Sequence, residues 1–207
     1  MNNLGVVGVI GRFKPLHNGG VVMLETLCEQ AEHVKIGIGS CNKYNVRNPF
    51  TAEESKAMID AVLSPKYSNY SFIFVPDFAH IPKYSNGERW VQEIVKQYGT
   101  LDTFISGDAY VTELLKDHYK VIHPASVVPE DKKVRLRATT VRLLMAQGDD
   151  DWKQLVSKPV ADYLENNGLV DRFRREFGLE TLAQLAGRAD YNVSEDVRAE
   201  KCHTMEA

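Results

Sequence analysis

The sequence predicts an α/β fold, namely a Rossmann-like open parallel sheet of about five strands with helices on both faces and a small C-terminal helical segment. Two observations support this prediction. Apolar runs of strand length alternate with amphipathic runs of helix length between residues 4 and 122, which is typical of parallel strands joined by right-handed crossovers. The first run, 4–10, is apolar on both faces of the expected strand, as in a strand buried inside a parallel sheet.

The elements of the sheet follow one another along the chain. A loop rich in glycine separates the first strand from the first helix, and Thr51-Ala-Glu-Glu54 has the form of a capping box that begins the second helix. Strands are expected at 4–10, 34–39, 71–75, 103–105 and 119–122, and helices at 21–31, from 51 to 62, at 88–98 and at 110–117.

The pattern changes close to residue 129. We expect residues 1–128 to form the Rossmann-like core, 129–187 a C-terminal helical part of the same domain, and 188–207 a flexible tail without periodicity. A charged connection opens the second part, and short helices are expected after it at 140–147, 149–152, 159–166 and 169–177.

Composition argues against several classes of function. With 25 basic and 28 acidic residues the net charge is −3, which does not favour nucleic acid as a partner. No apolar run is long enough for a membrane span, and the first residues lack the features of a signal peptide. The three cysteines, Cys28, Cys41 and Cys202, lack metal-binding spacing and suit a reducing compartment. We therefore expect a cytoplasmic protein without nucleic-acid or membrane partners.

The loop after the first strand, Gly11-Arg-Phe-Lys-Pro-Leu-His-Asn-Gly-Gly20, is the most informative segment. Ligands of open parallel sheets bind beyond the carboxyl ends of the strands, and free N–H groups at a helix start favour phosphate. His17 could donate to a phosphate oxygen, and Arg12 adds a positive charge. The loop is neither a Walker A motif nor a Gly-x-Gly-x-x-Gly fingerprint. Taken alone, an ordinary turn with a solvated histidine explains it equally well.

The segment from Arg12 to Gly19 resembles the signature of the nucleotidyltransferases that carry a His-x-Gly-His motif, and it is most similar to the archaeal-type nicotinamide mononucleotide (NMN) adenylyltransferases. Further similar segments follow in the family's order. They are Ile38-Gly-Ser40 with Asn48-Pro-Phe-Thr-Ala52, Val75-Pro-Asp77 with Trp90, and Arg137-Ala-Thr-Thr-Val-Arg142. The resemblance extends over residues 4–175.

The resemblance implies a reaction in which the phosphate of NMN attacks the α-phosphorus of ATP in line. The products would be NAD and pyrophosphate, and Mg²⁺ would be bound through the ATP phosphates, without metal ligands from the protein. The catalytic residues implied are His17, Arg142 and Arg12. The nucleotide-binding residues expected are Gly11, Phe13, Gly19, Gly20, Arg137, Thr139 and Thr140, and the acceptor-binding residues are Ser40, Asn48, Asp77 and Trp90. We add Ser106 and Asp108 to the nucleotide site because they follow the fourth strand. Family members also imply a homo-oligomer.

The chain departs from the family pattern at several positions. Gly20 stands where the second motif histidine is expected, Arg137 where a serine is expected, and Ser55 where an arginine is expected. The interval from Asp77 to Trp90 is longer than expected. Loss of an imidazole directed at the transition state would cost about 10²–10³ in rate. Replacement charge could come from Lys132, Lys133 or Arg137.

Three functions therefore remain open. The chain could be an NMN adenylyltransferase with a rearranged phosphate site, or an adenylyl- or cytidylyltransferase for another phosphorylated acceptor. It could also be a catalytically impaired relative that binds nucleotide or NAD. All three require that the loop with His17 and the helix with Arg142 face one shared cleft.

Overall fold

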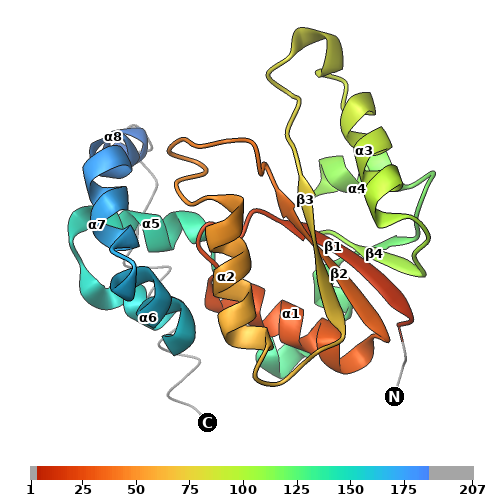
Figure 1. Ribbon diagram of the computed structural model, residues 1–207, viewed down its shortest axis with the longest axis horizontal. Helices are drawn as coiled ribbons and strands as arrows, with labels where there is room; N and C mark the ends of the chain where they lie inside the picture. Colours follow the sequence, from red (N-terminus) through yellow and green to blue (C-terminus); the bar gives the residue numbers. More distant parts are fainter. Residues whose placement is uncertain (1–3, 187–207) are drawn as a thin grey trace.

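The computed structural model describes residues 4–186, and within them five parallel strands form one sheet (Figure 1). The strand order is β3-β2-β1-β4-β5, and every neighbouring pair is parallel. This confirms the predicted fold class and strand number. The strands are β1 (Val6–Gly11), β2 (His33–Gly39), β3 (Tyr70–Val75), β4 (Thr103–Ile105) and β5 (Val121–Ile122).

Helices cover both faces of the sheet. Two apolar clusters show which helix packs on which face: α1 and α2 contribute to a large cluster with β1 and β2, whereas α3 and α4 contribute to a smaller one around Tyr98 and Phe104. The two pairs lie on opposite sides of the strands in Figure 1. The bounds are α1 (Asn18–Gln30), α2 (Ala52–Leu63), α3 (Glu88–Tyr98) and α4 (Ala109–Leu115).

Local signals explain where these helices begin. The predicted capping box of α2 is present, because the Thr51 hydroxyl accepts from the Glu54 N–H at 3.1 Å and the Glu54 carboxylate accepts from the Thr51 N–H at 2.8 Å. The first helix begins at Asn18, three residues before the expected start, because the His17 side chain acts as its N-cap. The bounds of α3 and β4 are as predicted.

The C-terminal helices gather beside α2 at one end of the sheet (Figure 1). They are α5 (Ala138–Gln147), α6 (Lys158–Asn166), α7 (Leu169–Phe173) and α8 (Leu179–Ala186). The helix expected at 169–177 is helical throughout, but it contains a π-helical turn at Arg174–Gly178 and continues as α8 to Ala186. Short 3₁₀ turns lie at Pro82–Tyr84, Pro124–Ser126, Glu130–Lys132 and Asp150–Leu155. The tail predicted at 188–207 lies outside the described residues.

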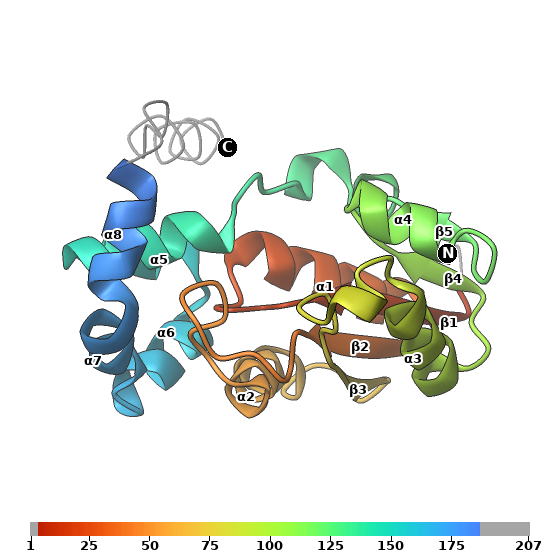
Figure 2. The same cartoon turned by 90° about the horizontal axis from the view of Figure 1, so that it is seen from above.

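The strand order determines where a ligand can bind. The next strand along the chain, β2, lies on one side of β1 in the sheet, and β4 lies on the other side of β1. Connections that diverge from adjacent strands open a crevice at the carboxyl ends of those strands. The loops after β1 and β4 both leave the sheet at this edge because the two strands are parallel neighbours. The start of α5 lies next to the start of α1 in Figure 2.

Candidate active site

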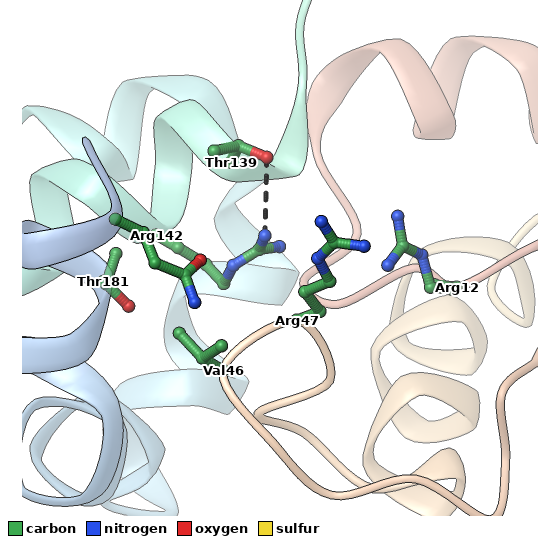
Figure 3. A pocket seen from close by; sticks show the side chains of 7 residues that line it. Arg12, Val46, Arg47, Thr139, Arg142 and Thr181 are labelled. Carbon is green, nitrogen blue, oxygen red and sulfur yellow. Dashed lines mark hydrogen bonds between the residues drawn. The ribbon is translucent and has the colours of Figure 1, made fainter. Parts of the chain in front are cut away.

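A polar pocket of about 270 Å³ lies at the carboxyl end of β1, shown in Figure 3. Four segments that are distant in the sequence form it: the loop after β1, the loop between β2 and α2, helix α5 and helix α8. The lining residues are Arg12, Val46, Arg47, Thr139, Arg142, Thr181 and Gln184.

Three arginines give the pocket its charge. The guanidinium groups of Arg12, Arg47 and Arg142 gather in one part of the pocket (Figure 3). None of the described residues that line it carries a carboxylate. Guanidinium groups bind phosphate through paired, charge-assisted hydrogen bonds, so this arrangement suits a polyanion.

Arg142, on helix α5, forms hydrogen bonds that connect this helix to the loop after β1. Its Nη1 donates to the Lys14 carbonyl at 2.8 Å, and its Nη2 donates to the Thr139 hydroxyl at 3.4 Å. The side chain is only 9% exposed, so these contacts hold the guanidinium in one orientation at the pocket wall. Lys14 lies within three residues of both Arg12 and His17. The structure therefore brings together the two segments that the resemblance placed around one polyanion.

His17 is half-buried at the start of α1 and is held as a neutral hydrogen-bond donor. Its Nδ1 accepts from the Gly20 N–H at 3.3 Å, so the proton of the neutral ring is assigned to Nε2. Burial lowers the pKa of His17 to about 4, because the charged form loses hydration. The ring is not among the residues that line the arginine pocket, although it shares a loop with Arg12.

The glycines of this loop allow close packing. A Cβ on Gly19 would lie 2.8 Å from the Val134 carbonyl oxygen, so the connection before α5 crosses directly over the start of α1. A Cβ on Gly20 would lie 2.9 Å from Cδ1 of Leu16. Leu16 is itself buried in the core, so at position 20 the chain has apolar packing where the family pattern has a histidine.

The remaining residues of the loop shape its backbone. Phe13 has a φ of +51°, and its ring lies so close to Gly11 that a Cβ there would be 2.7 Å from the ring. The structure thus gives Gly11 and Phe13 a role in loop shape, which is compatible with the predicted nucleotide contact but does not require it.

Lys14 is a buried cation that the sequence did not single out. Its side chain is 1% exposed, and Nζ donates to the Ser40 carbonyl at 3.1 Å. Burial lowers the pKa of Lys14 to about 8; Cys41 and Glu54 oppose this shift, and Arg12 adds to it. Through this bond Lys14 ties the loop after β1 to the loop after β2. Ser40, predicted to bind the acceptor, contributes through its backbone.

Two adjacent threonines at the start of α5 differ in whether they line the pocket. Thr139 lines the pocket, whereas Thr140 is 1% exposed and does not line it, so a nucleotide contact of Thr140 stays a prediction. Arg137 is exposed at the N-cap position and does not line the pocket. Lys132 is likewise exposed, and Lys133 forms an ion pair with Glu130. Among the residues that the structure describes, Arg47, rather than these three candidates, adds the extra charge.

Arg47 was not among the site residues predicted from the sequence, although its position in the sequence offers a reason to expect it there. Arg47 directly precedes Asn48-Pro-Phe, the segment already noted for its resemblance, in a loop that follows a strand. Asn48 itself is buried, and its Nδ2 donates to the Asn45 side-chain oxygen at 3.0 Å, so it stabilises the turn that carries Arg47.

Ser106 and Asp108 lie at the carboxyl end of β4, as predicted, and β4 pairs with β1 in the sheet. Both side chains have local structural roles. The Ser106 hydroxyl accepts from the Asp108 N–H at 3.1 Å, and the Asp108 carboxylate caps α4 by accepting from Tyr110 and Val111 N–H groups. Their position suits the nucleotide site, but neither lines the arginine pocket.

Asp77 and Trp90, predicted to bind the acceptor, are not among the residues that line the arginine pocket. The Asp77 carboxylate accepts from the Ala79 N–H at 2.8 Å, and its backbone pairs with the Asn42 side chain. Trp90 is half-buried against the smaller apolar cluster around Tyr98. The structure does not bring either residue into the pocket that contains Arg142.

The described residues offer neither a cluster of metal-binding side chains nor a membrane-spanning helix. No group of three or more histidine, cysteine or carboxylate side chains is placed to hold a metal ion between residues 4 and 186. None of the helices in this part of the chain is long and apolar enough to cross a membrane.

Comparison with known proteins identifies the family. The sequence model of the cytidylyltransferase-like family matches residues 9–148, which include the loop after β1, the Arg47 loop and α5. The chain belongs to this family. Thr181 and Gln184 of the pocket lie beyond the matched residues.

The cytidylyltransferase-like chain aligns with two curated relatives over most of its length. Over 170 residues it is 34% identical to the nicotinamide-nucleotide adenylyltransferase of Thermococcus sibiricus, covering 80% of this chain and 86% of that one. Over 171 residues it is 32% identical to the protein of the same name from Pyrococcus furiosus, and the alignment covers 80% of this chain and 85% of that one.

A solved structure supports the fold. A bifunctional NMN adenylyltransferase/ADP ribose pyrophosphatase from Francisella tularensis, complexed with AMP and a Mn ion, superposes with a TM-score of 0.55 at 19% identity. The alignment covers 84% of this chain and 55% of that protein, so the chain spans about half of its length.

Proposed function

We propose that the chain joins the AMP moiety of ATP to NMN, giving NAD and pyrophosphate. The observation that carries this proposal is the convergence of Arg12, Arg47 and Arg142 on one pocket at the sheet edge where open α/β folds bind ligands. The curated names of relatives at 32–34% identity support the same reaction.

The reaction needs positioning and charge stabilisation. An oxygen of the NMN phosphate forms a bond to the α-phosphorus of ATP, and the bond from that phosphorus to the bridging oxygen of the β-phosphate breaks. The electron pair leaves on pyrophosphate, so no proton has to be removed from the attacking phosphate dianion. The three guanidinium groups would hold the phosphates in line and stabilise the charge that develops on them.

His17 would act as a donor that stays neutral. Because Nδ1 is occupied by the Gly20 N–H, only Nε2–H is available for a phosphate oxygen. A pKa of about 4 means that the ring is neutral at pH 7, so it can contribute a directed hydrogen bond without exchanging its proton.

Mg²⁺ fits this site as a partner of the substrate. The described side chains contain no cluster that would hold a metal, so we propose that the ion enters on the phosphate oxygens of ATP. There it would neutralise part of the charge of the leaving group. The protein's contribution is to bind and orient the phosphates through Arg12, Arg47 and Arg142.

A second candidate is transfer to another phosphorylated acceptor. The observation in its favour is that Asp77 and Trp90 lie outside the arginine pocket, and Trp90 packs against the apolar cluster. A third candidate is a binding protein with impaired turnover, motivated by Gly20.

One assay separates the three candidates. The full chain is incubated with ATP, MgCl₂ and NMN, nicotinate mononucleotide or a sugar phosphate, with CTP replacing ATP in parallel, and products are identified by mass spectrometry. Formation of NAD and pyrophosphate from NMN supports the proposal. Turnover with another acceptor only, or binding of both nucleotides without turnover, would refute it. Light scattering on the same sample tests the predicted homo-oligomer.

A further inference from the structure

The loop that carries Arg47 to the pocket is ordered by a tight turn. Asn45 and Asn48 exchange two backbone hydrogen bonds of 3.2 and 2.7 Å, and the Asn45 side chain accepts from the N–H groups of Arg47 and Asn48. These bonds shape the turn itself. They do not determine where the turn lies relative to the pocket, so contacts at its two ends must do so.

Arg172, on α7, holds the C-terminal end of this loop. Its Nη1 and Nη2 donate to the two carboxylate oxygens of Glu54 at 2.6 and 2.7 Å, and Nη2 also donates to the Pro49 carbonyl at 3.2 Å. The side chains of Arg172 and Glu54 are 23% and 16% exposed, so this two-pronged pair is largely shielded from water. Pro49 lies two residues after Arg47.

The same guanidinium also supports the N-terminal end of the loop. The centre of the Arg172 guanidinium lies 5.7 Å from the Tyr44 ring, within the range of a cation–π contact. The Tyr44 hydroxyl donates to Glu176, and its ring packs edge to face on Phe177 at 5.1 Å. Tyr44 lies three residues before Arg47, so the loop is fixed on both sides of the arginine.

We propose that Arg172 is a positioning residue that holds Arg47 in the phosphate pocket through Pro49 and Tyr44. It also forms an ion pair with Glu54, whose carboxylate lies at the end of the loop that carries Arg47. The inference rests on the proposed function only in that Arg47 binds phosphate. It connects the C-terminal helices, beyond the segment matched by the family model, to substrate binding.

A double-mutant cycle with inorganic pyrophosphate tests this link. Titration calorimetry would compare the full chain with Arg172→Met, Arg47→Met and the double variant. Loss of one charge-assisted phosphate contact predicts that each single variant binds about tenfold more weakly. Because Arg172 acts through Arg47, the double variant should bind within about twofold of Arg47→Met. Wild-type affinity in Arg172→Met, or losses that multiply in the double variant, would overturn the proposal.

Two further variants protect the test against misfolding. Arg172→Lys keeps the charge but cannot span Glu54 and Pro49 together, so it should weaken pyrophosphate binding measurably; unchanged affinity in a folded Arg172→Lys protein would overturn the proposal. Lys158→Met is the matched control, because it removes an exposed ion pair with Asp162 on α6 without touching the loop. It should bind pyrophosphate as the wild type does.

The pyrophosphate readout is independent of the acceptor. If the wild type makes no NAD but the cycle shows the expected coupling, the proposed reaction fails and the role of Arg172 stands. If the wild type does not bind pyrophosphate, the Arg47 pocket is not a phosphate site and the role of Arg172 fails with it.

Discussion

The helix-capping role of His17 and its proposed catalytic role can be measured separately. Its Nδ1 caps α1 by accepting from the Gly20 N–H, and Nε2–H is the donor that the proposed function assigns to a phosphate oxygen. His17→Ala removes both functions, whereas His17→Asn places an amide oxygen at the cap and removes only the imidazole donor. Loss of an N-cap costs about 1 kcal/mol, and asparagine is among the best capping residues. We therefore expect His17→Ala, but not His17→Asn, to lower the free energy of unfolding by about that amount.

Both substitutions should lower activity to a similar extent. Removal of one directed donor to a transition-state oxygen costs about 10²–10³ in rate, or about 2.7–4 kcal/mol. The assay is kcat/KM for ATP with saturating acceptor, combined with urea unfolding of each variant. If His17→Asn retains activity within about threefold of the wild type, the imidazole does not donate to the transition state. Equal stability of the two variants would refute the capping role.

The pH dependence gives an independent test of the His17 assignment. The folded pKa of about 4 lies below the ordinary value of 6.5, so the unfolded chain binds more protons between these pH values. Stability is therefore fully present above pH 6.5 and falls as the pH is lowered toward 4. The loss should reach about 3 kcal/mol in the wild type relative to His17→Asn. Urea titrations of both proteins from pH 7 to pH 4 would check this difference.

Three further predictions concern neighbouring groups. Arg142→Lys keeps the charge but cannot reach both the Lys14 carbonyl and the pocket, so kcat/KM should fall by about 10² while circular dichroism stays unchanged. The folded pKa of Lys14, about 8, lies below its ordinary 10.5, so wild-type stability should rise from pH 8 to pH 10.5 relative to Lys14→Met, as measured by urea unfolding. Gly19→Ala places a Cβ 2.8 Å from the Val134 carbonyl oxygen and should lower the free energy of unfolding by about 1–3 kcal/mol, measured against Gly20→Ala, which meets only the end of a leucine side chain.

Local signals made much of the fold predictable. The α3 helix and the β4 strand have the predicted bounds, and the capping box of Thr51 and Glu54 is present, because these features depend on residues within a few positions of one another. The π-helical turn before α8 was not predicted, since nothing in the spacing of residues 174–178 distinguishes it from a continuous helix.

The site was predictable only in its parts. The motifs with His17 and Arg142 stand out in the sequence, but the choice between Thr139 and Thr140 depends on how α5 packs, and helix packing involves residues from several segments. Trp90 was predicted to bind the acceptor from the resemblance. On α3 it packs half-buried against the smaller apolar cluster, and its role in acceptor binding stays a prediction.

The sequence alone determined how strands and helices follow one another along the chain, the glycine-rich start of α1 and the residue types that can bind phosphate. Short-range backbone and side-chain preferences set these features. Only the tertiary structure decided that Arg47 joins Arg12 and Arg142, that Lys14 lies buried between two loops, and that α8 closes the pocket. These facts depend on which loops meet at the carboxyl edge of the sheet, and strand order and core packing settle that at a distance along the chain.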